Sequence, residues 1–254
     1  SLSAVQDAEN RIQMLAGGLP GSVHRLTMKP FGRSSSPIPD QHPLTRMGAA
    51  VRARLDADPQ VHRLPSDKAE IYAMGAFLDE TECRQLTTMI DTVAQPSTLF
   101  TAEESAAGYR TSYSGNLDAY DPFVQMISRR IDDLMGLPSE NGETLQGQRY
   151  TPGQQYKAHC DWFHTTEAHW KQEKRHGGQR CWTGMIYLND VEEGGETLFT
   201  NIGLQVTPQK GAMVMWNNAT VEGVPNDMTL HAALPVIRGA KHVVTRWYRV
   251  RPWG

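Results

Sequence analysis

Short runs rich in apolar and β-branched residues, separated by turn residues, dominate the chain from Leu145 onward. Apolar runs of this length between turn residues predict strands, and the run 242–250 also alternates. The runs predict eight strands, at roughly 145–151, 155–162, 180–189, 196–199, 204–207, 212–217, 229–234 and 242–250. Eight short strands favour an α+β, mainly β fold with a jelly-roll (double-stranded β-helix) core, which carries its ligand site in the mouth of the barrel.

Helical patterns and chain breakers occupy the first part of the chain. Apolar residues at helical spacing predict helices over residues 4–16 and 44–58, and the Pro- and Ser-rich stretch 28–43 predicts a linker or strap. We therefore expect a helical N-terminal extension and linker over residues 1–65, and the main domain over residues 66–254.

Two further helices are indicated by their termini. The acidic segment 79–82 resembles a capping box and predicts a helix that continues to about Val93. Asp121 and Pro122 predict the start of another helix, because proline is tolerated in the first turn, and Gly136 predicts its end. We expect these helices to pack against the outside of the sheet.

Composition and charge exclude several classes of partner. A formal net charge of −3 and a pI near 6.3 provide no broad basic surface for nucleic acid or an anionic membrane. Three cysteines without a Cys-x-x-Cys pair are too few for a disulfide framework and favour a cytoplasmic setting. No apolar run is long enough to span a bilayer, and the N-terminus lacks the regions of a signal peptide. The oligomeric state stays open.

Candidate metal chemistry begins with His159 and Asp161, which are two residues apart on a predicted strand and therefore share a face. One imidazole and one carboxylate form part of a two-His, one-carboxylate site for Fe(II). The pair alone is a weak indication, because a His and an Asp at this spacing also occur by chance. His231 and Lys241 follow downstream, where they can supply a third metal ligand and an anion-binding cation.

Residues 149–250 resemble the catalytic core of the prolyl 4-hydroxylases, members of the 2-oxoglutarate and Fe(II)-dependent dioxygenase superfamily. The resemblance covers about a hundred residues and preserves the order of the motifs. Its matching pieces are Tyr150, the segment His159-Cys160-Asp161, residues 185–199, residues 210–216, His231, Lys241 and Trp247.

This resemblance implies that residues 66–254 form the catalytic domain of a hydroxylase. It implies Fe(II) as cofactor and 2-oxoglutarate and O₂ as cosubstrates. Ascorbate is a further candidate cofactor. His159, Asp161 and His231 are the expected Fe(II) ligands; a zinc hydrolase is disfavoured, because nothing nearby resembles a dedicated hydrolytic base.

The same resemblance assigns residues to the cosubstrate. Lys241 is expected to bind the distal carboxylate of 2-oxoglutarate and, with the three metal ligands, completes the expected catalytic set. Tyr150 and Thr197 are expected to donate hydrogen bonds to the same end of 2-oxoglutarate.

Substrate recognition is the third implication of the resemblance. The residues it assigns to a proline-containing peptide, or to a proline-like molecule, are Arg110, Ser112, Glu143, Tyr156, Arg180 and Trp247. Arg249 is a departure, since the family commonly has His at this position. If Arg249 faces the peptide channel, it favours an acidic neighbour or a free carboxylate.

Alternatives remain open from the sequence. The enzyme can act on a free amino acid or another small molecule, and a non-catalytic jelly roll with a vestigial metal site is a candidate of another class. A nucleic-acid demethylase is disfavoured by Lys241 and the acidic balance. The polar stretch 164–178 can be a mobile lid over the substrate or a solvated loop.

Overall fold

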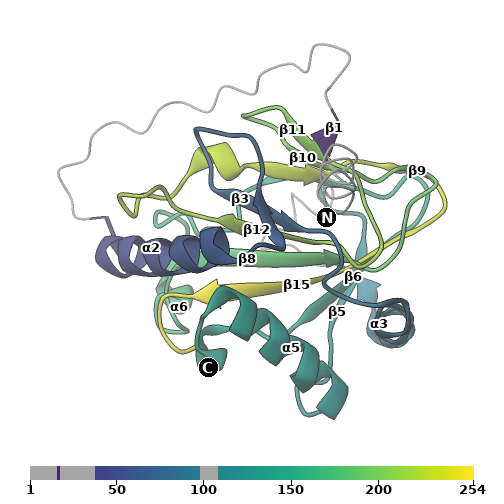
Figure 1. Cartoon of the computed structure of the whole chain (residues 1–254), viewed down its shortest axis with the longest axis horizontal. Coiled ribbons are helices and arrows are strands. Elements are labelled where there is room, and N and C mark those ends of the chain that lie inside the picture. The colour runs from purple at the N-terminus through teal and green to yellow at the C-terminus, as the bar shows by residue number, and fades with distance from the viewer. Residues whose placement is uncertain (1–15, 18–37, 98–107) are drawn as a thin grey trace.

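Two antiparallel sheets form the centre of the fold, which the computed structural model describes for residues 16–17, 38–97 and 108–254 (Figure 1). The large sheet has the strand order β2 (Val61–Arg63), β3 (Ile71–Met74), β12 (Met213–Asn217), β8 (Arg180–Tyr187), β15 (Lys241–Arg249), β6 (Gln146–Tyr150), β5 (Tyr113–Asn116) and β4 (Gln95–Pro96). The small sheet has the order β1 (Ala16–Gly17), β11 (Leu204–Val206), β10 (Thr197–Phe199), β13 (His231–Ala233) and β7 (Tyr156–His159). A separate pair joins β9 (Glu193–Gly194) to β14 (Val236–Arg238).

The central strands of the large sheet are buried on both faces. In β12, Met213 and Met215 pack among the helices, whereas Val214 and Trp216 belong to the core between the two sheets. The face of β12 that carries Val214 and Trp216 is turned toward the small sheet, and the candidate residues lie between the two sheets.

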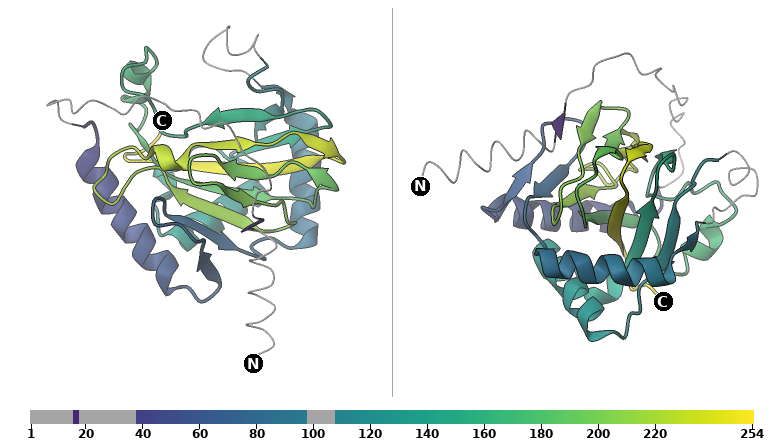
Figure 2. Two further views of the ribbon diagram at one scale, coloured as in Figure 1. Left: turned by 90° about the horizontal axis from the view of Figure 1, so that it is seen from above. Right: turned by 90° about the vertical axis from the view of Figure 1, so that its right-hand side faces the viewer.

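Three helices cover the outer face of the large sheet: α2 (Gln41–Ala57), α3 (Glu80–Val93) and α5 (Pro122–Met135). Figures 1 and 2 show these helices on one side of the large sheet and the small sheet on the other. Short helical turns occur at η1 (Ser139–Asn141), α6 (Trp170–Glu173) and η2 (Asp227–Thr229). Within the described ranges, no helix has the length and apolar character needed to cross a membrane.

The predicted helix ends are confirmed. Asp79 and Glu82 form a reciprocal capping box at the start of α3, satisfying backbone N–H groups that the helix leaves free. Asp121 caps α5, and Gly136 ends it with a positive φ of 65°, a conformation that glycine adopts without a steric penalty.

The jelly-roll prediction is confirmed, and each of the eight predicted strands has a counterpart. The apolar stretch 69–78 also predicts a strand, and β3 occupies part of it. The sequence did not predict the short strands β1, β2, β4, β5, β9 and β14, because two to four residues are too few to show a period. Helix α2 begins at Gln41, inside the predicted linker, since Pro43 lies in its first turn. The helix predicted over 4–16 falls almost entirely outside the described residues.

The boundary predicted between residues 65 and 66 falls within one sheet and one core. β2 precedes this boundary and pairs with β3 after it, while Leu44 and Val51 of α2 pack in the same cluster as Trp182 of β8. Residues 41–63 are therefore part of the main body of the fold.

Candidate active site

A cavity of about 760 Å³ opens between the two sheets. It collects nearly every residue that the sequence predicted to be functional. Those that line it are Arg110, Glu143, Tyr150, Tyr156, His159, Asp161, Arg180, Thr197, His231, Lys241 and Trp247; Ser112 does not. Residues separated by more than a hundred positions thus meet in one pocket, as expected for a barrel that binds a ligand in its mouth.

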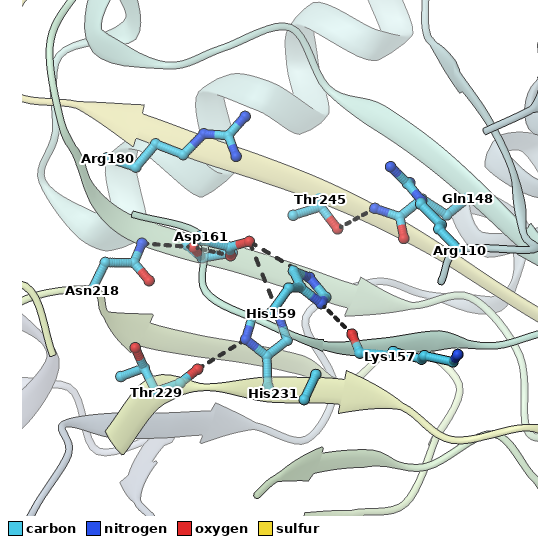
Figure 3. A network of polar contacts seen from close by, with 12 residues as sticks. Arg110, Gln148, Lys157, His159, Asp161, Arg180, Asn218, Thr229, His231 and Thr245 are labelled. Carbon is cyan, nitrogen blue, oxygen red and sulfur yellow. Dashed lines mark hydrogen bonds and ion pairs between the residues drawn. The ribbon is translucent and has the colours of Figure 1, made fainter. Parts of the chain in front are cut away.

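The three predicted metal ligands converge on one wall of this cavity (Figure 3). His159 ends β7 and His231 begins β13, and the two residues are direct partners across these antiparallel strands. Asp161 follows β7, and its Oδ1 lies 3.9 Å from Nε2 of each histidine. Within the described ranges, these three residues are the group of His, Cys, Asp or Glu side chains placed to hold one ion, with ligand atoms within 4.8 Å of one another.

Both histidines have a nitrogen directed to the shared space. Nδ1 of His159 lies 2.9 Å from the carbonyl oxygen of Lys157, and Nδ1 of His231 lies 2.9 Å from that of Thr229. A carbonyl oxygen only accepts, so each Nδ1 carries the proton and each Nε2 presents a lone pair. Burial, together with nearby His231, lowers the pKa of His159 to about 3, which keeps this imidazole neutral and able to bind a metal.

The carboxylate of Asp161 is oriented by a short relay of hydrogen bonds. Thr183 Oγ1 donates to Asp161 Oδ2 at 2.7 Å, and Asn218 Nδ2 donates to Thr183 Oγ1 at 2.9 Å. Burial opposes ionisation of Asp161, but its neighbours His231, His159 and Arg180 and the Thr183 hydrogen bond together hold its pKa below the ordinary value. Oδ1 of Asp161 is thus a charged metal-ligand atom that faces the two histidines.

Two imidazoles and one carboxylate form the N,N,O donor set of a facial triad for Fe(II), so the residues present fit the metal that the sequence predicted. The backbone carbonyls behind the histidines and the hydroxyl behind the carboxylate supply the outer bonds that such ligands require.

Lys241 begins β15 and is a buried cation in the same cavity, with 2% of its surface exposed. Its Nζ lies 3.5 Å from Thr197 Oγ1 and 5.3 Å and 5.5 Å from the ring centres of Tyr150 and Tyr187. Among the described side chains, no carboxylate forms an ion pair with it. Burial lowers the pKa of Lys241 to about 7, and a bound carboxylate would restore the charged form.

Hydroxyl groups surround this ammonium group. Tyr187 donates to Thr197 Oγ1 at 2.7 Å, and Tyr150, the cross-strand partner of Lys241, donates to Gln148 Oε1 at 2.9 Å. One buried cation with adjacent hydroxyl groups suits the distal carboxylate of 2-oxoglutarate.

Arg110 also lines the cavity, at its isolated bridge with Tyr156. Its Nε donates to Ser112 Oγ at 3.1 Å, its Nη2 donates to Gln146 Oε1 at 3.2 Å, and its guanidinium lies 4.7 Å from the Tyr156 ring centre. Ser112 is buried behind Arg110, so the prediction of direct substrate contact by Ser112 is replaced by indirect support through Arg110.

Glu143 and Arg180 form a bidentate ion pair at the cavity wall. Arg180 Nε and Nη2 donate to the two oxygens of Glu143 at 2.6 Å and 2.7 Å. The Arg180 guanidinium also lies 4.2 Å from the Trp247 ring centre. This cluster of three residues joins charge and aromatic surface at the place predicted for substrate.

Arg249 does not present a free cation to a peptide channel. It is 3% exposed, bonds Glu143 Oε1 through Nε, and donates to Glu173 Oε2 at 2.7 Å through Nη2. The acidic neighbours that the sequence suggested for its partner are therefore residues of the protein itself.

Gln148, Thr183 and Asn218 support the site without belonging to a motif. Gln148 and Thr183 lie two residues from Tyr150 and Met185 on predicted strands, so the strand period alone places them on the cavity face. Asn218 follows β12, and no nearby sequence signal relates it to Asp161.

The sequence is similar to those of known proteins. A profile of the 2OG-Fe(II) oxygenase superfamily matches residues 145–249. The chain is 32% identical over 211 residues to prolyl 4-hydroxylase 2 of Arabidopsis thaliana. This match covers 73% of this chain and 69% of the plant protein. It is 37% identical over 161 residues to prolyl 4-hydroxylase subunit alpha-1 of Homo sapiens, covering 63% of this chain. That match spans 29% of the subunit's length.

A solved structure extends the comparison to three dimensions. The viral collagen prolyl hydroxylase of Paramecium Bursaria Chlorella virus-1, in its 2-oxoglutarate complex, superimposes with a TM-score of 0.55 at 25% identity. The match covers 70% of this chain and 94% of the viral chain.

Proposed function

Since this chain is a prolyl 4-hydroxylase-like member of the 2-oxoglutarate and Fe(II)-dependent oxygenase superfamily, we propose that it hydroxylates prolyl residues within a peptide or protein. It is a 2-oxoglutarate-dependent dioxygenase that uses Fe(II) and O₂. The observation that carries the proposal is the convergence of an N,N,O donor set, a buried lysine and an aromatic wall in one cavity.

The metal side of the cavity has a defined task. His159, Asp161 and His231 would hold Fe(II), which with 2-oxoglutarate supplies O₂ activation coupled to decarboxylation of 2-oxoglutarate. Lys241 and Thr197 would fix the distal carboxylate of 2-oxoglutarate at the buried side of the cavity.

The substrate side offers an aromatic wall and guanidinium groups. Tyr156 and Trp247 provide apolar contact for a prolyl ring. The bonds of Arg180 to Glu143 use Nε and Nη2, so Nη1 is the group we assign to a peptide carbonyl. A peptide segment, rather than a lone amino acid, is long enough to contact Trp247 and Arg180 as well as Tyr156 and the adjacent Arg110.

The test is turnover with Fe(II), 2-oxoglutarate and O₂, against proline-rich peptides and free amino acids, with succinate and oxygen addition scored together. We expect succinate formation and one added oxygen on a prolyl residue of a peptide. Oxygen addition to a free amino acid alone would replace the peptide proposal with the small-molecule alternative. Absence of succinate under all conditions would contradict the enzyme. The cytoplasmic location and the effect of ascorbate stay predictions.

A further inference from the structure

Arg249 connects two parts of the protein that are separate in sequence. Its Nε bonds Glu143 on the substrate side of the cavity, and its Nη2 donates to Glu173 at 2.7 Å in α6. Its Nη1 donates to the carbonyl oxygen of Gly178 at 2.7 Å. Each of the three nitrogens of this buried guanidinium therefore donates a hydrogen bond, one to Glu143 and two to the segment 164–178.

The segment 164–178 and the residues before it build part of the cavity wall. Trp162, Phe163, His164, Glu167 and His169 line the cavity on the way into α6. The position of α6 therefore determines the shape of the wall that a substrate meets.

Phe163 shows how tightly the two parts are joined. Its ring centre lies 5.0 Å from the guanidinium of Arg180 and 4.5 Å from that of Arg249. Its backbone N–H and C=O both bond the Gln179 side chain, at 2.8 Å and 2.6 Å. The wall residue, the Glu143–Arg180 pair and the end of the segment thus share one packed cluster.

Charge balance makes Arg249 necessary to this cluster. Glu143 and Glu173 contribute two carboxylates, and Arg180 and Arg249 contribute two guanidinium groups. Without Arg249, Glu143 would keep Arg180, but Glu173 and the carbonyl of Gly178 would lose a buried donor. Loss of one partner from a buried ion pair is costly, because the other group stays desolvated.

We propose that Arg249 is a positioning residue for the substrate, because it locks the segment 164–178 and the Glu143–Arg180 pair into a single preformed wall. This inference rests on the proposed function and assigns a fixed wall, rather than a mobile lid, to the segment. It predicts that Arg249 acts on substrate binding and leaves the binding of metal and 2-oxoglutarate unchanged.

The variants separate the two ends of the bridge. Arg249→Gln removes the guanidinium, Arg249→Lys keeps the charge but cannot bond three acceptors in the same geometry, and Glu173→Gln weakens only the α6 end. Arg238→Gln is the matched control, because Arg238 forms an exposed ion pair with Glu192 and does not line the cavity.

Two measurements test the proposal on the full chain. Limited trypsin digestion reports exposure of Lys171, Lys174 and Arg175 in the segment, and does not depend on catalysis. Steady-state kinetics with the peptide identified for the wild type separates KM from kcat. Equilibrium binding of Mn(II) and 2-oxoglutarate serves as the check on the other half of the site.

We expect faster cleavage at these sites and a peptide KM raised roughly tenfold or more in Arg249→Gln. Glu173→Gln and Arg249→Lys should show smaller changes in the same direction, while the control resembles the wild type. Wild-type digestion and KM in both Arg249→Gln and Glu173→Gln would overturn the proposal. Loss of 2-oxoglutarate binding in the folded Glu173→Gln protein would also overturn it. A wild type that hydroxylates no peptide would refute the proposed function, whereas the digestion result would still decide whether Arg249 fixes the segment.

Discussion

His159 and His231 are cross-strand partners in β7 and β13, and their ring centres lie 4.3 Å apart. Strand pairing, with each Nδ1 bonded to a backbone carbonyl, therefore sets the positions of two metal ligands before any ion binds. The third ligand, Asp161, follows β7 and is oriented instead by the hydrogen bond that Thr183 of β8 donates to it.

Thr183→Val should weaken metal binding. Valine has nearly the shape of threonine but lacks the hydroxyl that donates to Asp161 Oδ2 at 2.7 Å. We expect a loss of about 10- to 100-fold in Mn(II) affinity, measured by paramagnetic resonance titration. Thr183→Ser keeps the donor and should remain close to the wild type; equal affinity in the valine variant would contradict the role of the relay.

Binding of 2-oxoglutarate should depend on pH through Lys241. Burial lowers the pKa of this lysine to about 7 in the free protein, and the charged form is the one that binds a carboxylate. Affinity should therefore be constant below about pH 7 and fall roughly tenfold per pH unit above it, until the raised pKa of the complex is reached. Calorimetric titrations across this range measure the slope, and a flat profile would contradict the assignment.

Lys241→Met should abolish tight 2-oxoglutarate binding and yet stabilise the protein without ligand. Below pH 7 the buried charge of Lys241, which forms no ion pair with a described carboxylate, lowers the free energy of unfolding of the wild type, and methionine removes that charge. Because the folded pKa lies below the unfolded one, wild-type stability recovers as pH rises from about 7 to 10. The free energy of unfolding of the variant should thus exceed that of the wild type by more at pH 6 than at pH 9. Denaturant titration at both values tests this, and destabilisation at pH 6 would contradict it.

Asp79→Ala should affect the fold alone. The side chain of Asp79 accepts from the backbone N–H of Glu82 at 2.8 Å and caps α3 away from the cavity. Its loss should lower the free energy of unfolding by about 1 kcal/mol. Mn(II) affinity should not change, and a parallel loss of affinity would show that α3 and the site are coupled.

Much of the fold and site could be predicted because the information is local. The continuous apolar run 212–216 is typical of a strand buried on both faces, and the spacing of His159 and Asp161 predicts a shared direction. The family motifs then placed His231 and Lys241 in the same cavity.

The rest depends on contacts between distant segments. Asn218 reaches Asp161 only through Thr183, and the role of Arg249 depends on where α6 lies. Neither contact is indicated in the sequence by a strand or helix period or by a motif of fixed spacing. Arg249 in particular looked like a cation available to substrate, whereas the fold uses it within the protein.

The most direct test of the account is mass spectrometric sequencing of a proline-containing peptide after turnover under isotopically labelled O₂, with succinate measured in the same sample. The account predicts one labelled oxygen on a prolyl ring, succinate in at least equal amount, and loss of both products in His231→Ala. Labelled oxygen on another residue, or the same prolyl product from His231→Ala, would contradict it.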